Sequence, residues 1–153
     1  YGPWGRPDMA LFKFTKNILA GKPIDIYNYG NMKRDFTYID DLTEAIRLLI
    51  DVKPLSPSKR KKNIKFDNIS DTGPYRIVNI GNSKEVNLLS YIEELEKNLG
   101  IKAKKNFLGM QEGDVEATLS DINLLKTLTG FSPKKKLKQG IIEFVDWYKS
   151  YYS

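Results

Sequence analysis

The sequence contains neither cysteine nor histidine among its 153 residues. Without cysteine the chain forms no disulfide and offers no thiolate nucleophile, and without histidine it has no imidazole base. The two absences together also exclude nearly every zinc site. Any chemistry must therefore use Asp, Glu, Lys, Arg, Tyr, Ser or Thr side chains, and we predict no metal site.

Long hydrophobic runs are missing as well. No apolar stretch approaches the roughly 20 residues that span a bilayer, and no charged-then-apolar signal peptide opens the chain. We therefore expect a soluble, cytoplasmic protein without a membrane partner. The first residue is Tyr1 rather than Met, which is typical of a trimmed or deliberately shortened chain.

Glycine-rich phosphate loops are the third absence. The chain has no G-x-G-x-x-G and no G-x-x-x-x-G-K-[ST] segment, the loops that hold dinucleotides and nucleoside triphosphates. Tyr29 and Lys33 have the spacing of a catalytic Tyr-x-x-x-Lys pair, but that pair needs a helical turn and residues 30–32 predict a loop. Asp40 and Asp41 could act as an acid/base pair, although helix capping explains them better. We therefore predict no catalytic residue in this chain.

The excess positive charge is concentrated in one place. The formal net charge is +6, and the stretch between Val52 and Phe66 accounts for it with these basic residues and no acidic one: Lys53, Lys59, Arg60, Lys61, Lys62 and Lys65. Proline and serine interrupt the same stretch, so residues 52–74 are expected to form a basic surface loop. Because no aromatic and basic stripe accompanies it, we predict no nucleic-acid partner, with a contact to a phosphate polymer as the alternative.

The hydrophobic content of 41% is enough for one core and one domain. Hydrophobic periodicity predicts a helix capped by Asp8, a helix capped by Asp41, and a helix capped by Asn87 that ends at Gly100. It also predicts helices from Ser120 or Asp121 to Gly130 and over 137–151. Short strands are predicted over 23–29, 36–39, 75–80 and 103–108. This irregular alternation indicates a mixed α/β or α+β fold rather than a complete doubly wound sheet.

Two arginines are candidates for binding a phosphate group. Arg6 lies in a Gly/Pro-rich turn just before a predicted helix, where free backbone N–H groups and the helix dipole favour an anion. Arg34 follows a second turn and precedes a strand, so the two guanidinium groups could clamp a diphosphate. The alternative is a pair of surface arginines, one of them paired with Asp8 or Asp35.

Asp114 is a candidate for contacting a sugar. It follows Gly113 after a predicted strand, where a carboxylate could accept hydrogen bonds from a ribose diol. A plain turn is the alternative explanation.

Four segments resemble one family of enzymes. They are residues 1–10 (Tyr-Gly-Pro-Trp-Gly-Arg-Pro-Asp-Met-Ala), 33–41 (Lys-Arg-Asp-Phe-Thr-Tyr-Ile-Asp-Asp), 78–82 (Val-Asn-Ile-Gly-Asn) and 111–115 (Gln-Glu-Gly-Asp-Val). In this order they resemble the C-terminal half of extended short-chain dehydrogenase/reductase nucleotide-sugar epimerases and dehydratases, and most closely the UDP-glucuronate 4-epimerases. The resemblance covers essentially the whole chain, with the basic surface loop as its least familiar part.

The resemblance implies roles for individual residues. Arg34 is similar to the arginine that grips the substrate diphosphate, and the backbone of Met9 and Ala10 to the helix start beside it. The remaining implied roles are a uracil pocket at Ile26 and Tyr27, a ribose contact at Asp114, a contact from Arg6 to the glucuronate carboxylate, and cofactor contacts at Tyr1, Gly2 and Pro3. Gln111 departs from the pattern, because several relatives have there an arginine that makes a second phosphate contact.

The resemblance also implies that residues 1–153 are only a substrate-binding portion. The family oxidises C4 of the sugar with NAD, lets the 4-keto intermediate rotate, and returns the hydride. Its NAD loop and its catalytic Tyr-x-x-x-Lys pair precede the segment that resembles residues 1–3. We therefore expect an incomplete fold, a mixed α+β lobe with the C-terminal elements of a Rossmann-like domain and without the N-terminal dinucleotide-binding domain. Such a chain is expected to bind a UDP-sugar, to be inactive alone and to self-associate, whereas the full-length enzyme is expected to be a homodimer. A free-standing module that binds nucleotide sugars or polyanions is the alternative.

Overall fold

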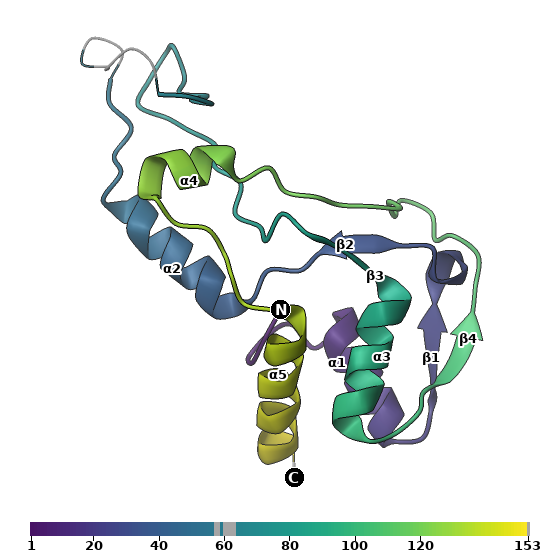
Figure 1. Ribbon diagram of the computed structural model, residues 1–153. Helices are drawn as coiled ribbons and strands as arrows, with labels where there is room; N and C mark the ends of the chain where they lie inside the picture. The colour runs from purple at the N-terminus through teal and green to yellow at the C-terminus, as the bar shows by residue number, and fades with distance from the viewer. Residues whose placement is uncertain (57–58, 60–63, 153) are drawn as a thin grey trace.

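The computed structural model describes residues 1–56, 59 and 64–152. These residues form five α-helices, four short strands and one 3-10 turn, and Figure 1 shows how the helices and strands are arranged. In chain order the elements are α1 (Ala10–Leu19), β1 (Pro23–Ile26), η1 (Tyr27–Gly30), β2 (Lys33–Asp35), α2 (Ile39–Ile50), β3 (Glu85–Asn87), α3 (Leu88–Leu99), β4 (Lys104–Phe107), α4 (Asn123–Thr129) and α5 (Leu137–Tyr152).

The strands form two small sheets. β1 and β4 pair in parallel, with Pro23 opposite Lys104 and Ile26 opposite Phe107. β2 and β3 pair antiparallel, with Arg34 opposite Val86. An isolated parallel bridge joins Lys33 to Ala117, so the chain after β4 also runs beside β2. The mixed helix and strand composition expected from the sequence is confirmed.

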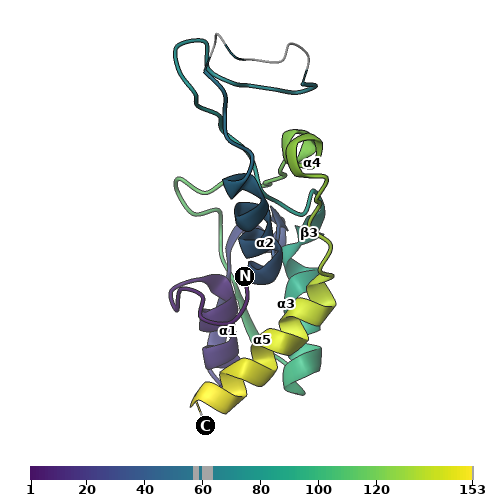
Figure 2. The ribbon, with the colours of Figure 1, turned by 90° about the vertical axis from the view of Figure 1, so that its left-hand side faces the viewer.

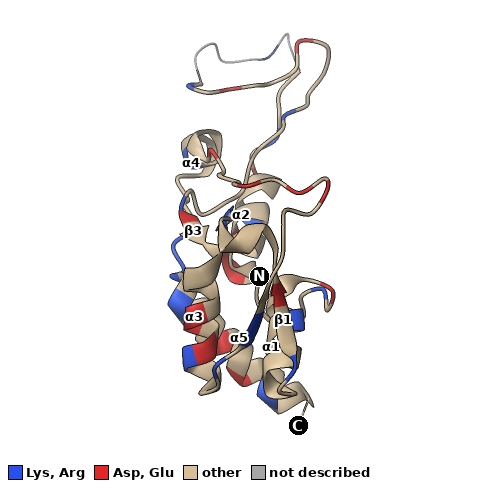
Figure 3. Cartoon of the chain, turned by 90° about the vertical axis from the view of Figure 1, so that its right-hand side faces the viewer, with Lys and Arg blue, Asp and Glu red and all other residues tan. Residues whose placement is uncertain are grey.

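The hydrophobic core lies between α1, α3, α5 and β1. Figure 2 shows α5 crossing in front of α1 and α3, with α2 and α4 at the other end of the molecule. The side chains that form this core are Leu11, Phe12, Phe14, Ile18, Ile24, Ile26, Tyr91, Ile92, Leu95, Leu99, Ile141, Phe144, Val145 and Tyr148. Figure 3 shows both acidic and basic residues along α3, which also carries the buried residues Tyr91, Ile92, Leu95 and Leu99, as expected for an amphipathic helix.

Local signals account for several helix ends. The Asn87 side chain accepts a hydrogen bond from the Leu89 N–H at 2.9 Å and so caps α3. α3 ends at Gly100 and α4 at Gly130, both in the left-handed conformation that glycine adopts without strain. These predicted boundaries are confirmed.

The predicted caps at Asp8 and Asp41 are wrong. α1 begins after Met9 and α2 after Tyr38, and neither residue makes a side-chain cap. The Asp8 carboxylate instead pairs with Arg6. Asp41 lies in the first turn of α2 and accepts hydrogen bonds from the backbone N–H groups of Lys134 (3.0 Å) and Lys135 (2.8 Å). Asp41 therefore ties α2 to the segment that leads into α5.

Two predicted strands are also wrong. The strand predicted over 36–39 lies three residues earlier, at Lys33–Asp35, and Ile39 already begins α2. Residues 75–80 form no helix and pair with no strand within the described part of the chain, and the Ile77 side chain stays exposed. An apolar sequence forms a strand only where another strand offers it hydrogen bonds.

The described part of the basic surface loop contains no helix or strand in 52–56 and 64–74. It is anchored at its far end by a buried ion pair, because the Arg76 guanidinium donates to both Asp67 oxygens at 2.8 and 3.0 Å. The alternative of a polyanion-binding module depends on the basic residues 59–62, and of these Arg60, Lys61 and Lys62 lie outside the described residues. None of the helices in the described ranges combines the length and apolar character needed to cross a lipid bilayer.

Candidate functional site

An open pocket of about 450 Å³ lies where the start of α1, the end of β1, the β2–β3 sheet and the start of α3 meet. It is lined by Met9, Ala10, Phe14, Asp25, Tyr27, Met32, Arg34, Asp35, Phe36, Val86, Leu88, Tyr91 and Asp114. Most of these side chains are apolar, with a few charged groups among them. An apolar cavity with a few convergent polar groups is the usual form of a small-molecule site.

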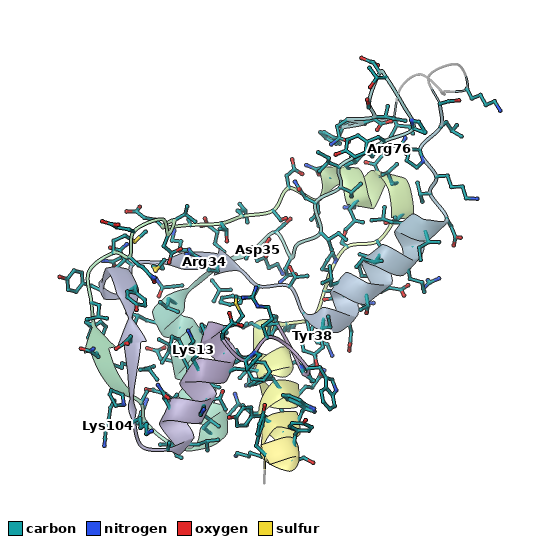
Figure 4. All side chains as sticks on the ribbon, turned by 180° about the vertical axis from the view of Figure 1, so that it is seen from behind. Lys13, Arg34, Asp35, Tyr38, Arg76 and Lys104 are labelled. Atoms are coloured by element: carbon teal, nitrogen blue, oxygen red, sulfur yellow. The ribbon has the colours of Figure 1, made fainter. Side chains whose placement is uncertain are left out.

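Arg34 is the only cationic side chain that lines this pocket among the residues described. Its guanidinium donates to the Asp114 carboxylate at 2.6 Å and to the backbone carbonyls of Lys33 (2.9 Å) and Glu116 (3.2 Å). The Arg34 side chain remains 27% exposed. Figure 4 shows it projecting from β2 next to Asp35. A partly exposed guanidinium fixed in this way is suited to bind a phosphate group.

Asp35, the next residue on β2, has a structural role. Its carboxylate accepts hydrogen bonds from the backbone N–H groups of Asn82 (3.1 Å), Ser83 (3.0 Å) and Ser120 (3.1 Å). These three bonds join the segments before β3 and before α4 to the sheet. Because the carboxylate is already satisfied, Asp35 holds the pocket wall in place.

The apolar wall of the pocket is made by aromatic rings. Phe36 stacks on Tyr91, with ring centroids 4.5 Å apart and planes within 2°. Tyr91 is almost completely buried, and burial raises the pKa of its hydroxyl. Tyr91 therefore stays neutral at pH 7 and contributes apolar surface rather than a charge.

Asp25 is the third carboxylate that lines the pocket. It lies on β1 and accepts a hydrogen bond from the Asn106 amide of β4 at 2.8 Å.

The structure brings five of the predicted site residues into this one pocket. They are Met9, Ala10, Tyr27, Arg34 and Asp114. The sequence did not indicate the apolar wall or Asp25. The only signal that could have identified part of the wall is Phe36, which lies within the Arg-Asp-Phe segment beside Arg34.

The other predicted site residues lie outside the pocket lining. Ile26 is completely buried in the core, and Gln111 is exposed on the turn before Asp114. Arg6 pairs with Asp8 at 2.5 and 3.1 Å, is largely exposed and does not line the pocket, and its role in a clamp with Arg34 stays a prediction. This geometry matches the alternative interpretation of the sequence, in which Arg6 is a surface arginine paired with Asp8.

The segment assigned to cofactor contacts packs into the fold. The Tyr1 ring makes edge contacts with Phe36 and Tyr38. A Cβ on Gly2 would lie 2.7 Å from the Ile39 side chain, which explains a glycine there. The cofactor roles of Tyr1, Gly2 and Pro3 stay predictions.

The Tyr29 and Lys33 pair is not assembled. Residues Asn28 and Tyr29 have positive φ angles in η1, and Lys33 contacts Glu85 at 3.4 Å. No helical turn therefore joins the two side chains, as the sequence predicted. Within the described residues, no group of three acidic side chains forms a metal site either.

Comparison with known proteins shows which family the chain resembles. Residues 1–64 match the model of the NAD dependent epimerase/dehydratase family. The chain is 54% identical to an uncharacterized 37.6 kDa protein of Escherichia coli O111:H- and 47% identical to a probable UDP-glucuronate 4-epimerase of Rhizobium meliloti. Each alignment covers 99% of this chain and 45% of the relative, so the chain spans less than half the length of the curated relatives it matches.

A solved structure shows the same similarity. The fold matches a UDP-glucuronic acid 4-epimerase from Bacillus cereus, solved in complex with UDP-glucuronic acid and NAD, with a TM-score of 0.80 and 35% identity. The match covers 99% of this chain and 43% of that structure. Only part of the Rossmann-like extended fold of these enzymes is therefore present here. Over residues 1–64 the chain is similar to the NAD dependent epimerase/dehydratase family, and the proteins that it resembles over its whole length include UDP-glucuronate 4-epimerases.

Proposed function

We propose that residues 1–153 are the substrate-binding portion of an NAD-dependent enzyme that interconverts UDP-glucuronate and UDP-galacturonate by epimerisation at C4. The observation that carries this proposal is the pocket, which unites the start of α1 with Arg34 and Asp114. The relatives named as UDP-glucuronate 4-epimerases support the choice of substrate. The parent enzyme is proposed to be a cytoplasmic homodimer.

In this proposal the substrate diphosphate lies between Arg34 and the start of α1. The first N–H groups of a helix have no intrahelical partner, and no side chain caps α1. These groups and the helix dipole therefore favour an anion next to Met9 and Ala10. The Arg34 guanidinium supplies the opposite wall of the same pocket. Together they would hold the two phosphates with charge-assisted hydrogen bonds.

The nucleoside is proposed to lie beside Tyr27, with Asp114 directed to the ribose. Tyr27 lies directly after β1 and lines the same pocket as Arg34. Ile26 lies at the end of the buried strand β1, which positions Tyr27.

The role of Gln111 is proposed to be minor, because its amide cannot replace an arginine charge. Arg6 is proposed to leave Asp8 and to pair with the sugar carboxylate when substrate is present.

NAD would supply hydride acceptance and return at C4 of the sugar. The sequence of this chain has no glycine-rich dinucleotide loop, so none of its residues is assigned to the NAD pyrophosphate. The dinucleotide-binding domain and the catalytic Tyr-x-x-x-Lys pair are proposed to belong to the rest of the parent enzyme. This chain binds and orients the UDP-sugar, and it is proposed to be inactive alone.

The test is UDP binding by the chain with Arg34→Ala. Loss of a charge-assisted contact should weaken UDP binding by about 1.5–3 kcal/mol, measured by isothermal titration calorimetry. Arg47→Ala is the matched control, because Arg47 is an exposed arginine on α2 that pairs with Glu44 and does not line the pocket. An unchanged isotherm for Arg34→Ala would contradict the proposed diphosphate site.

A further inference from the structure

The charges in the pocket do not favour an anion as they stand. The pocket lining contains one guanidinium, from Arg34, and three carboxylates, from Asp25, Asp35 and Asp114. Asp35 accepts three backbone hydrogen bonds and Asp25 accepts one from Asn106. Asp114 is different, because its Oδ1, which also accepts a hydrogen bond from the Val115 N–H at 2.8 Å, contacts the same guanidinium that the proposed function assigns to the diphosphate. In this state a carboxylate neutralises the cation of the site.

Arg34 does not depend on Asp114 for its position. One of its terminal nitrogens donates to the Lys33 and Glu116 carbonyls at 2.9 and 3.2 Å, and only the other contacts Asp114. The two carbonyls hold the plane of the guanidinium whether or not Asp114 is in contact. A phosphate that arrived at the Asp114 side would therefore meet an arginine that is already oriented.

The backbone that carries Asp114 is also held independently. Lys33 donates its N–H to the Glu116 carbonyl at 2.8 Å, and its own carbonyl accepts from the Thr118 N–H at 3.2 Å. Asp114 itself lies on an exposed turn, closed by a 3.2 Å bond from its N–H to the Gln111 carbonyl. Rotation of the Asp114 side chain away from Arg34 breaks its bond from the Val115 N–H, which water can replace on this exposed turn, but it breaks none of the backbone bonds of the neighbouring segment.

We propose that Asp114 is an exchangeable internal ligand of Arg34. A nucleoside diphosphate takes over the guanidinium, and the released carboxylate accepts hydrogen bonds from the ribose hydroxyls of the same ligand. Recognition of the diphosphate and recognition of the ribose are thereby coupled. The diphosphate contact with Arg34 frees Asp114 for the ribose, and the ribose contact with Asp114 frees Arg34 for the diphosphate. This inference rests on the proposed function, since it names the events within that same pocket.

The test uses Asp114→Asn and two pairs of probes in isothermal titration calorimetry. Removal of the competing charge should tighten the binding of inorganic pyrophosphate by about three- to tenfold, the range set by a partly exposed ion pair. The same variant should lose discrimination between UDP and 2′,3′-dideoxy-UDP, which the unmodified chain should bind about five- to tenfold more weakly than UDP. Asp114→Ala should give the same two results as Asp114→Asn. Agreement between the two variants would show that the lost charge, rather than the altered side-chain shape, causes them.

The matched control is Glu112→Gln, which removes one negative charge two positions earlier on the same exposed turn. It should leave both measurements unchanged. If Asp114→Asn does not tighten pyrophosphate binding while Arg34→Ala still weakens UDP binding, the exchange is refuted and the proposed function stands. If the unmodified chain binds neither UDP nor pyrophosphate, the proposed function fails and the exchange fails with it.

Discussion

Glu96 is expected to be the main source of acid sensitivity in this chain. It lies on α3, is only 2% exposed, and accepts hydrogen bonds from the Lys102 ammonium at 2.8 Å and the Ala103 N–H at 3.0 Å. The Lys105 ammonium on β4 contacts the same carboxylate. Burial alone would raise the pKa of Glu96, but the hydrogen bonds from Lys102, Lys105 and Ala103 outweigh it and lower the pKa to about 2.

The size of the effect follows from this pKa. The difference between 4.5 for an ordinary glutamate and about 2 in the folded chain corresponds to about 3 kcal/mol of stability at pH 7. Because the folded-state pKa is the lower one, this contribution is present above pH 4.5 and is lost as the pH falls toward 2. Glu96→Gln should therefore lower the free energy of unfolding by about 2–3 kcal/mol at pH 7 and by less than about 1 kcal/mol at pH 2.

Urea denaturation followed by circular dichroism, repeated from pH 7 to pH 2, measures both values. Glu93→Gln is the matched control, because Glu93 lies one turn earlier on α3 and is exposed. It should change the free energy of unfolding by less than about 0.5 kcal/mol at every pH. A cost for Glu96→Gln that is equally small, or that stays the same from pH 7 to pH 2, would refute the electrostatic reasoning.

Two further substitutions test the packing of the fold. Gly81→Ala should lower the free energy of unfolding by about 2–4 kcal/mol, because the added Cβ would lie 2.2 Å from the Ser120 Cβ and 2.7 Å from an Asp35 oxygen. Thermal melting beside Gly73→Ala, where a Cβ meets open space, measures this, and equal melting temperatures would contradict it. Tyr1→Phe should be neutral or stabilising by up to about 1 kcal/mol, because the Tyr1 hydroxyl is buried without a hydrogen-bond partner among the described residues. A clear decrease in melting temperature would show that this hydroxyl has a partner.

The helices of this fold could be predicted because their signals are local. Apolar spacing located α1, α3 and α5, while Asn87, Gly100 and Gly130 marked boundaries that the structure keeps. The two wrongly predicted caps, Asp8 and Asp41, had an equally good local signal. They cap no helix because the Asp8 carboxylate pairs with Arg6, and the Asp41 carboxylate binds a backbone segment more than 90 positions away.

The site could be predicted only in part. Arg34, Asp114 and the start of α1 were indicated by turns, charge and a family resemblance, and they line one pocket. Asp25, Phe14 and Tyr91 carry no such signal, because they meet only when three separate elements pack. The strand predicted at 75–80 failed for a related reason, since pairing depends on a neighbour that local sequence does not specify.

The parallel pairing of β1 with β4 has a consequence for the order of folding. Asp25 and Asn106 are 81 positions apart in sequence, and closing a loop of that length costs about 4 kcal/mol of chain entropy. The helices form locally and early, so this pairing is expected among the last steps. During synthesis, Ile24 and Ile26 emerge long before residues 104–107 exist. The two side chains that end up fully buried are thus held for that interval in an unpaired strand, the state most open to association with another chain.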